Sequence, residues 1–264
     1  MGIPLRGGLV VLGTRRTEYR EFPPHPSLAH AVALSWVGRA GWRRLLRILP
    51  DGCADLVWDG RLLLVSAAHA GPLRVAVGEH GTSVGVRLRP GIAGTLIGCP
   101  PSELVPSPLP LRRFRGPEIR LLEDRLRAAD GPEARRRVLE HGVGRLLEAG
   151  PDPDRAVLEA GRRLAGGLVS VERVAAAVGL TPRELRRRFL AQVGYGPKAL
   201  ERVLRFHRFV RRLEVVAAGC SSLAGTAASL GYADQAHLGR ECLRLSGSTP
   251  GALVSRWTAP AETF

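Results

Sequence analysis

The chain has 264 residues, 45% of them hydrophobic, and a formal net charge of +15 at pH 7. This length gives room for two packed domains and a connecting segment, and no stretch approaches the roughly 20 apolar residues that span a bilayer. The first 20 residues contain four arginines and no uninterrupted apolar core, so no signal peptide is expected. We therefore expect a soluble, cytoplasmic protein.

The first 110 residues contain short apolar runs separated by glycine and proline. Val84–Leu88 alternates between apolar and other residues, which is typical of a half-buried β-strand. We predict an α+β protein whose residues 1–110 form a small β-rich domain. The apolar runs are Leu9–Leu12, Leu45–Leu49, Asp55–Trp58, Leu62–Val65, Leu73–Val77 and Val84–Leu88.

Two motifs in this half suggest chemistry, and each has a simpler interpretation. Asp51 and Asp55 are either a carboxylate pair facing a ligand or capping groups of the turn at 50–52, the more ordinary role. Residues 81–85 match the G-x-S-x-G nucleophile motif, but a strand-like run follows Ser83 where a helix is required. We therefore predict no catalytic residue and no enzyme.

The cysteines and histidines predict no metal site, and we expect no cofactor. The four cysteines form no C-x-x-C pair and no zinc spacing with the histidines. Scattered cysteines are by default reduced and structural, and a redox role for Cys53 or Cys99 stays open.

Helical periodicity with dense charge follows at Glu118–Ala129, Pro132–Ala149 and Asp154–Leu164. We predict a helical connector over residues 111–165. It either transmits a change of state, forms a dimer seam, or is a packed linker with a solvated face.

The last hundred residues contain one helical unit twice. Matches at a constant offset, in the same order, are the mark of an internal repeat. The matching pairs are Leu185/Leu238, Arg187/Arg240, Phe189/Cys242, Gly194/Gly247 and Pro197/Pro250 at an offset of 53, and Ala175/Ala227, Val178/Leu230 and Gly179/Gly231 at 52.

Each copy has the pattern of two helices joined by a glycine turn, the plan of a helix-turn-helix. In the first copy Gly179 ends one helix. Thr181, Pro182 and Glu184 begin the next as N-cap, first helical residue and capping-box carboxylate. The predicted outward helices span about 182–193 and, one residue later relative to the turn, 234–245.

A connecting helix and a basic stripe join the copies. Ala199–Leu213 is predicted to be one helix, which spans roughly 22 Å and would separate the outward helices by about 34 Å, one turn of B-DNA. Residues 181–212 hold nine arginines and Lys198 against two glutamates. Such a stripe is usually a solvated face, but its place on a capped, repeated helix favours nucleic-acid binding.

Residues from about Val169 to Leu253 resemble the DNA-binding domain of AraC/XylS-type transcription regulators, a seven-helix module with two helix-turn-helix units. The resemblance implies a double helix-turn-helix domain over 166–255, followed by a tail over 256–264. Leu238 and Cys242 stand where the family commonly has aromatic residues, so Cys242 is expected to be buried. The matching residues are Ala175, Gly179, Leu185, Arg187, Phe189, Gly194, Pro197, Arg205, Ala227, Gly231, Tyr232, Asp234, Gln235, His237, Arg240, Gly247 and Pro250.

The geometry of the two copies and the resemblance together imply roles in DNA binding. Arginine makes bidentate contacts with guanine and glutamine with adenine, and helix N-termini approach phosphate through backbone N–H groups. The predicted base contacts are Arg183, Arg186, Arg187, Gln235, His237 and Arg240, and the predicted phosphate contacts are Thr181, Arg188 and Asp234, with packing as the alternative for Arg188.

Three segments of the first half, 19–24, 48–58 and 84–91, resemble an uncharacterised domain that often precedes this module. The resemblance implies a cupin-like sensory or dimerisation domain and names no ligand. The predicted function is a sequence-specific transcription regulator that binds double-stranded operator DNA; further partner classes are a small-molecule effector, RNA polymerase and a second copy in a homodimer. The alternatives are a nonspecific architectural nucleic-acid-binding protein and an enzyme with its site in the N-terminal domain.

Overall fold

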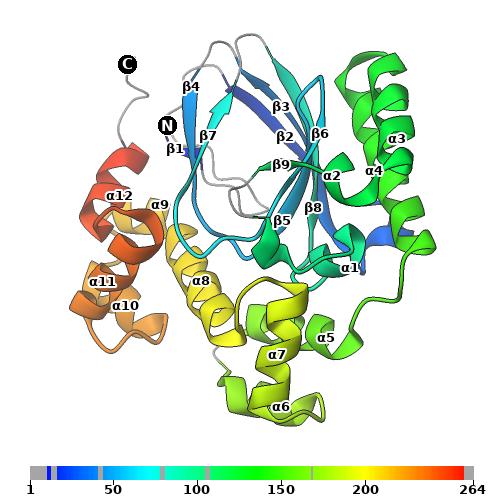
Figure 1. Cartoon of the computed structure of the whole chain (residues 1–264). Coiled ribbons are helices and arrows are strands. Elements are labelled where there is room, and N and C mark those ends of the chain that lie inside the picture. The colour runs from blue at the N-terminus through cyan, green and yellow to red at the C-terminus, as the bar shows by residue number, and fades with distance from the viewer. Residues whose placement is uncertain are drawn as a thin grey trace.

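The computed structural model describes residues 11–12, 17–40, 44–77, 81–104, 108–167 and 169–258 (Figure 1). In that part of the chain a β-rich N-terminal half precedes a helical C-terminal region, which confirms the predicted α+β class. The start of the predicted strand at Leu9–Leu12 and the end of the predicted tail, from residue 259, lie outside the described residues.

The N-terminal half contains two antiparallel sheets. The larger sheet has the strand order β2-β3-β8-β5-β6-β9 and the smaller has the order β1-β4-β7. The strands are β1 (Val11–Leu12), β2 (Thr17–Phe22), β3 (Val32–Ala40), β4 (Arg44–Ile48), β5 (Ala54–Trp58), β6 (Leu63–Ser66), β7 (Leu73–Val77), β8 (Thr82–Leu88) and β9 (Leu109–Pro110).

The predicted apolar runs coincide with strands, whereas β2, β3 and β9 were not predicted. β3 pairs with both β2 and β8, from Val32↔Leu88 to Arg39↔Thr82 on the β8 side, so it lies inside the sheet. Its apolar residues are mixed with serine, glycine and arginine, which dilutes the hydrophobic signal of a strand.

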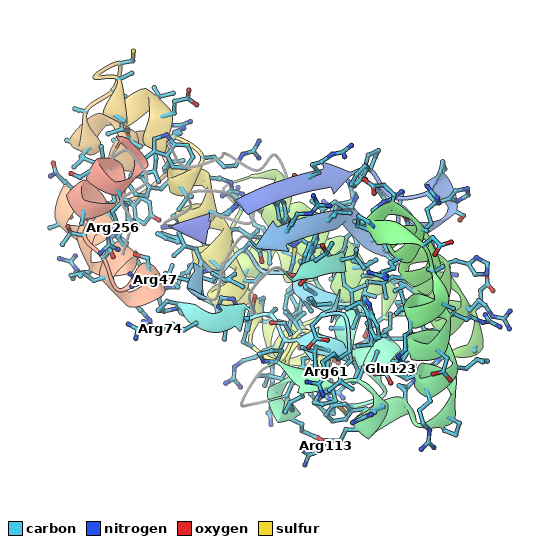
Figure 2. The ribbon with its side chains drawn as sticks, turned by 90° about the horizontal axis from the view of Figure 1, so that it is seen from above. Arg47, Arg61, Arg74, Arg113, Glu123 and Arg256 are labelled. Carbon is cyan, nitrogen blue, oxygen red and sulfur yellow. The ribbon has the colours of Figure 1, made fainter. Side chains whose placement is uncertain are left out.

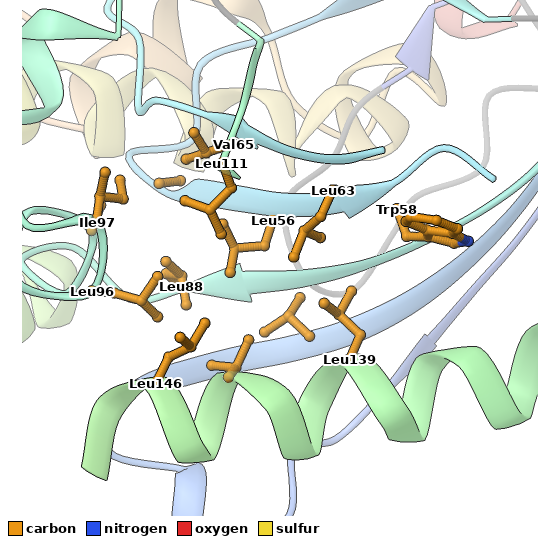
Figure 3. Close-up of a cluster of buried hydrophobic side chains, with 14 of the residues drawn as sticks. Leu56, Trp58, Leu63, Val65, Leu88, Leu96, Ile97, Leu111, Leu139 and Leu146 are labelled. Carbon is orange, nitrogen blue, oxygen red and sulfur yellow. The ribbon is translucent and has the colours of Figure 1, made fainter. Parts of the chain in front are cut away.

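Helices cover one face of the larger sheet (Figure 1). Leu139 and Leu146 of α4 are buried in one core with Leu56, Leu63 and Leu88 of the strands, as Figure 3 shows. The predicted connector therefore contributes its first helices to the core of the β-rich half. The helices of this part of the chain are η1 (Pro26–Leu28), α1 (Ala93–Ile97), η2 (Pro101–Glu103), α2 (Arg112–Arg115), α3 (Pro117–Ala128) and α4 (Gly131–Ala149).

The remaining helices form two further cores. Val157 and Leu164 of α5 pack with the first helix-turn-helix copy, and the second copy has a separate core with the later part of α8. No described helix has both the length and the apolar character needed to cross a membrane. The helices are α5 (Arg155–Gly166), α6 (Val171–Ala177), α7 (Pro182–Gln192), α8 (Pro197–Val210), α9 (Leu213–Ala217), α10 (Leu223–Ser229), α11 (Gln235–Ser246) and α12 (Pro250–Thr258).

Candidate nucleic-acid interface

The first helix-turn-helix unit is α6, a glycine turn and α7. Gly179 has φ +70°, a left-handed conformation that glycine adopts at little cost, and the chain then turns into α7. The Glu184 amide donates to the Thr181 hydroxyl at 3.2 Å, and the Thr181 amide donates to the Glu184 carboxylate at 2.9 Å. This second hydrogen bond lowers the pKa of Glu184. The predicted capping box is therefore confirmed.

The second unit, α10 and α11, repeats the first. Ser170 and Ser222 cap α6 and α10 at an offset of 52, and Gly231 has φ +73° at the same place in the turn. Asp234 then caps α11 by accepting from the His237 amide. Because Thr181 and Asp234 differ by 53, the second turn is one residue longer, as predicted.

The outer face of α7 carries three arginines. Leu185 and Phe189 are fully buried on the inner face, whereas Arg183, Arg186 and Arg187 are exposed. These three guanidinium groups form no hydrogen bond or ion pair with another residue in the described part of the chain. Their donors are therefore available to a partner.

Other arginines of the basic stripe are used inside the protein. Arg188 pairs with the Asp154 carboxylate at the start of α5 at 3.3 Å. Arg202 Nε donates to Glu241 of α11 at 2.8 Å, which lowers the pKa of that carboxyl.

Two more of these arginines bind backbone carbonyls. Arg205 donates to the Gly231 carbonyl at 3.1 Å and also pairs with Glu201. Arg208 donates to three carbonyls at the end of α5, those of Leu164, Ala165 and Gly167. These groups hold the units together.

The α11 face is less basic than the α7 face. Gln235 and Arg240 are exposed, and neither forms a hydrogen bond with another described residue. His237 is half-buried and packs edge-on against Tyr232, with ring centroids 5.3 Å apart. Cys242 is fully buried in the core of this unit, as expected, and burial raises the pKa of its thiol to about 12.

The connecting helix begins two residues earlier and ends three residues earlier than predicted. The sequence indicated one helix over Ala199–Leu213, but α8 ends at Val210 and α9 begins separately at Leu213. Arg211 and Arg212 form the break between them. Leu200 belongs to the core of the first unit and Val203 to that of the second, so α8 still joins both units.

The β-rich half contacts this helical region at several points. Gly52 faces α8 so closely that a Cβ there would lie 2.7 Å from Leu200 Cδ1, and Leu49 is buried in the core of the second unit. Arg47 and Arg256 both donate to the Ser248 hydroxyl at 3.2 Å, and Figure 2 shows Arg47 beside the C-terminal helices.

Asp51 and Asp55 meet at a buried arginine. Arg87 is 1% exposed and lies 3.1 Å from a carboxylate oxygen of each aspartate. Burial opposes its charge, but the two carboxylates outweigh burial and raise the pKa of Arg87. Asp51 also accepts from the Cys53 amide at 2.9 Å, so it does cap the turn.

The other chemical motifs of the N-terminal half have structural settings. Ser83 lies inside β8, so the G-x-S-x-G match lacks the strand-turn-helix geometry of a nucleophile elbow. Burial raises the pKa of the thiols of both Cys53 and Cys99. No group of three or more potential metal ligands occurs among the described residues.

A family model matches part of each half of the chain. Residues 20–110 match a domain of unknown function, and residues 174–256 match the helix-turn-helix domain. No protein with a curated description matches the chain.

Two of the solved structures that are similar to the chain have low sequence identity to it. The chain is similar to ToxT from Vibrio cholerae at 8% identity over 93% of this chain and 98% of that chain, with a TM-score of 0.39. It is also similar to unsaturated fatty acid bound ToxT from Vibrio cholerae at 10% identity over 97% of each chain, with a TM-score of 0.40. Similarity at this level establishes neither a shared ligand nor a shared mechanism.

Two capped helix-turn-helix units joined by a helix define the C-terminal region as a DNA-binding domain. The match over residues 174–256 identifies this domain as a helix-turn-helix domain of the AraC type.

Proposed function

We propose that this regulator reads two successive major-groove segments of an operator, one with each of the outward helices α7 and α11. The base contacts are made by Arg183, Arg186 and Arg187 from α7 and by Gln235, His237 and Arg240 from α11. The N-termini of these helices, at Thr181 and Asp234, approach phosphate groups through backbone N–H groups.

One observation carries this proposal: the basic stripe divides into free and internally bound arginines. Among the described residues, three of the free side chains lie on the outer face of α7, where a groove would meet them, and a fourth, Arg211, lies at the break after α8. Four others bind carboxylates or carbonyls, and Arg212 donates to the Ser229 hydroxyl. A solvated charged face would not need this division. Arg188 belongs to the bound group, which favours packing over a phosphate contact.

The N-terminal domain, in this proposal, senses a small-molecule effector or mediates self-association. Its contacts with both helix-turn-helix units support such a role, because a conformational change in the domain would alter the packing around α8. The partners are then operator DNA, an effector or a second copy of the chain, and RNA polymerase.

The test is selection of bound fragments from a random duplex pool at physiological salt, using the full chain. A two-part motif with its halves about one helical turn apart is expected. If no motif is enriched and random duplex binds as tightly as any selected fragment, the protein is a nonspecific architectural one and the proposal fails.

A further inference from the structure

Two exposed leucines lie at equivalent places on the outward helices. Leu190 of α7 is 37% exposed and Leu243 of α11 is 50% exposed. In the described part of the chain four large apolar side chains are exposed, the other two being Leu121 and Val215. Leu190 and Leu243 are separated by 53 residues, the offset that relates α7 to α11. The exposed leucine is therefore a repeated feature of the unit.

On α7 the leucine lies among the free arginines. Leu190 follows Arg183 by seven residues, Arg186 by four and Arg187 by three, spacings that place side chains on one face of a helix. Leu185 and Phe189 are buried on the opposite face. Leu190 is thus part of the surface that the proposed function brings into the groove.

On α11 the same surface is mostly apolar. The residues seven, four and three positions before Leu243 are Ala236, Gly239 and Arg240, so two of the three arginine positions of α7 are replaced by small residues. Ala236 is exposed, and a Cβ at Gly239 would meet nothing within 4 Å. At these four positions Arg240 and Leu243 are the only extended side chains, and Gln235, eight residues before Leu243, lies beside them.

The apolar feature that a base presents in the major groove is the C5-methyl group of thymine. We propose that Leu190 and Leu243 contact thymine methyl groups in the two half-sites, an inference that rests on the proposed function. The α11 half-site then combines a thymine for Leu243 with a guanine for Arg240, and the α7 half-site is richer in guanine. A protein-binding surface would need a larger contiguous apolar patch, whereas each of these leucines is flanked by arginine.

Deoxyuridine tests the proposal directly, because it differs from thymidine only by the missing methyl group. In the motif selected by the wild-type chain, each thymine is replaced in turn and binding is measured by fluorescence anisotropy. Wild type should bind about fourfold more weakly when uracil replaces thymine at one position in each half-site, because the free energy of burying one methyl group is lost. Leu243→Ala should bind the thymine duplex about fourfold more weakly and should no longer distinguish thymine from uracil at its own position. Leu190→Ala should do the same in the other half-site.

Leu121→Ala is the matched control, since Leu121 is 54% exposed on α3, away from the outward helices. It should leave both affinity and uracil discrimination unchanged. The proposal is overturned if uracil substitution is neutral for wild type, or if the leucine variants keep wild-type discrimination. A motif without uracil sensitivity overturns the leucine contacts alone, whereas the absence of any motif overturns the proposed function and these contacts with it.

Discussion

Replacing Gly94 by alanine tests how the first unit is held against the β-rich half. Gly94 is the second residue of α1, and a Cβ there would lie 2.6 Å from the Ala191 carbonyl oxygen and 2.9 Å from Gln192 Cα at the end of α7. Both are backbone atoms, so no side-chain rotation relieves the contact. The higher helix propensity of alanine should therefore stabilise the protein, whereas the close contact between α1 and α7 should destabilise it.

The magnitude follows from these two effects. Alanine at an interior helix position gains up to about 1 kcal/mol over glycine, while forcing extra atoms into a packed contact costs about 1–3 kcal/mol. The same shift would strain the hydrogen bond from Thr95 Oγ1 to Gln192 Oε1, which is 2.9 Å long. We expect Gly94→Ala to lower the free energy of unfolding by about 1–2 kcal/mol.

Gly251→Ala is the matched control, because Gly251 is also the second residue of its helix, α12, and a Cβ there meets nothing within 4 Å. It should be neutral or slightly stabilising. Urea denaturation followed by circular dichroism compares the two variants, and hydrogen exchange at the end of α7 locates the change. If Gly94→Ala is as stable as Gly251→Ala, the docking contact does not exist in solution.

Three further changes test the site and the buried groups. Arg187→Ala should weaken operator binding by roughly 1–3 kcal/mol, relax specificity at one base position and leave the thermal midpoint unchanged, because the guanidinium forms no hydrogen bond or ion pair with another described residue. Equal losses on operator and random duplex would reduce it to a phosphate contact. Arg87→Met leaves two half-buried carboxylates without their cation and should lower the free energy of unfolding by about 3–5 kcal/mol in chemical denaturation. A loss well under about 1 kcal/mol would mean that water solvates these carboxylates. Cys53 should be alkylated by iodoacetamide much more slowly than the exposed Cys220 at neutral pH and faster as the pH rises, since burial raises the pKa of the Cys53 thiol and the thiolate is the reactive form. Similar rates by peptide mass spectrometry would contradict this burial.

The features that the sequence predicted correctly are local. Capping by Thr181 and Glu184 depends on residues three apart, and the turn at Gly179 depends on one residue's freedom. Because the second copy repeats the first, the same residues at the repeat offset predicted the second helix-turn-helix unit. Helix periodicity was similarly sufficient for α3, α4 and α5.

The features that the sequence did not predict depend on contacts between distant segments. Alternation in β8 indicates one buried and one solvated face, yet Arg87 is buried because two aspartates from another strand and its turn neutralise it. Gly94 and Gly52 resemble ordinary glycines until the helices they approach are known. The sequence likewise did not show which arginines of the basic stripe are free. That depends on carboxylates outside the stripe, such as Asp154 and Glu241.

Leu49 makes the two DNA-binding units unequal in autonomy. The core of the first unit includes residues of α5, the helix that precedes it. The core of the second unit includes Leu49 from the β-rich half, which is buried there with Val203 and Phe206 of α8. A fragment that begins at Arg155 would keep α5 and with it the core of the first unit, but it would leave a cavity in the second unit where Leu49 packs. Removal of residues 1–154 would thus weaken the second unit alone, and the N-terminal half is a structural part of the DNA-binding machinery.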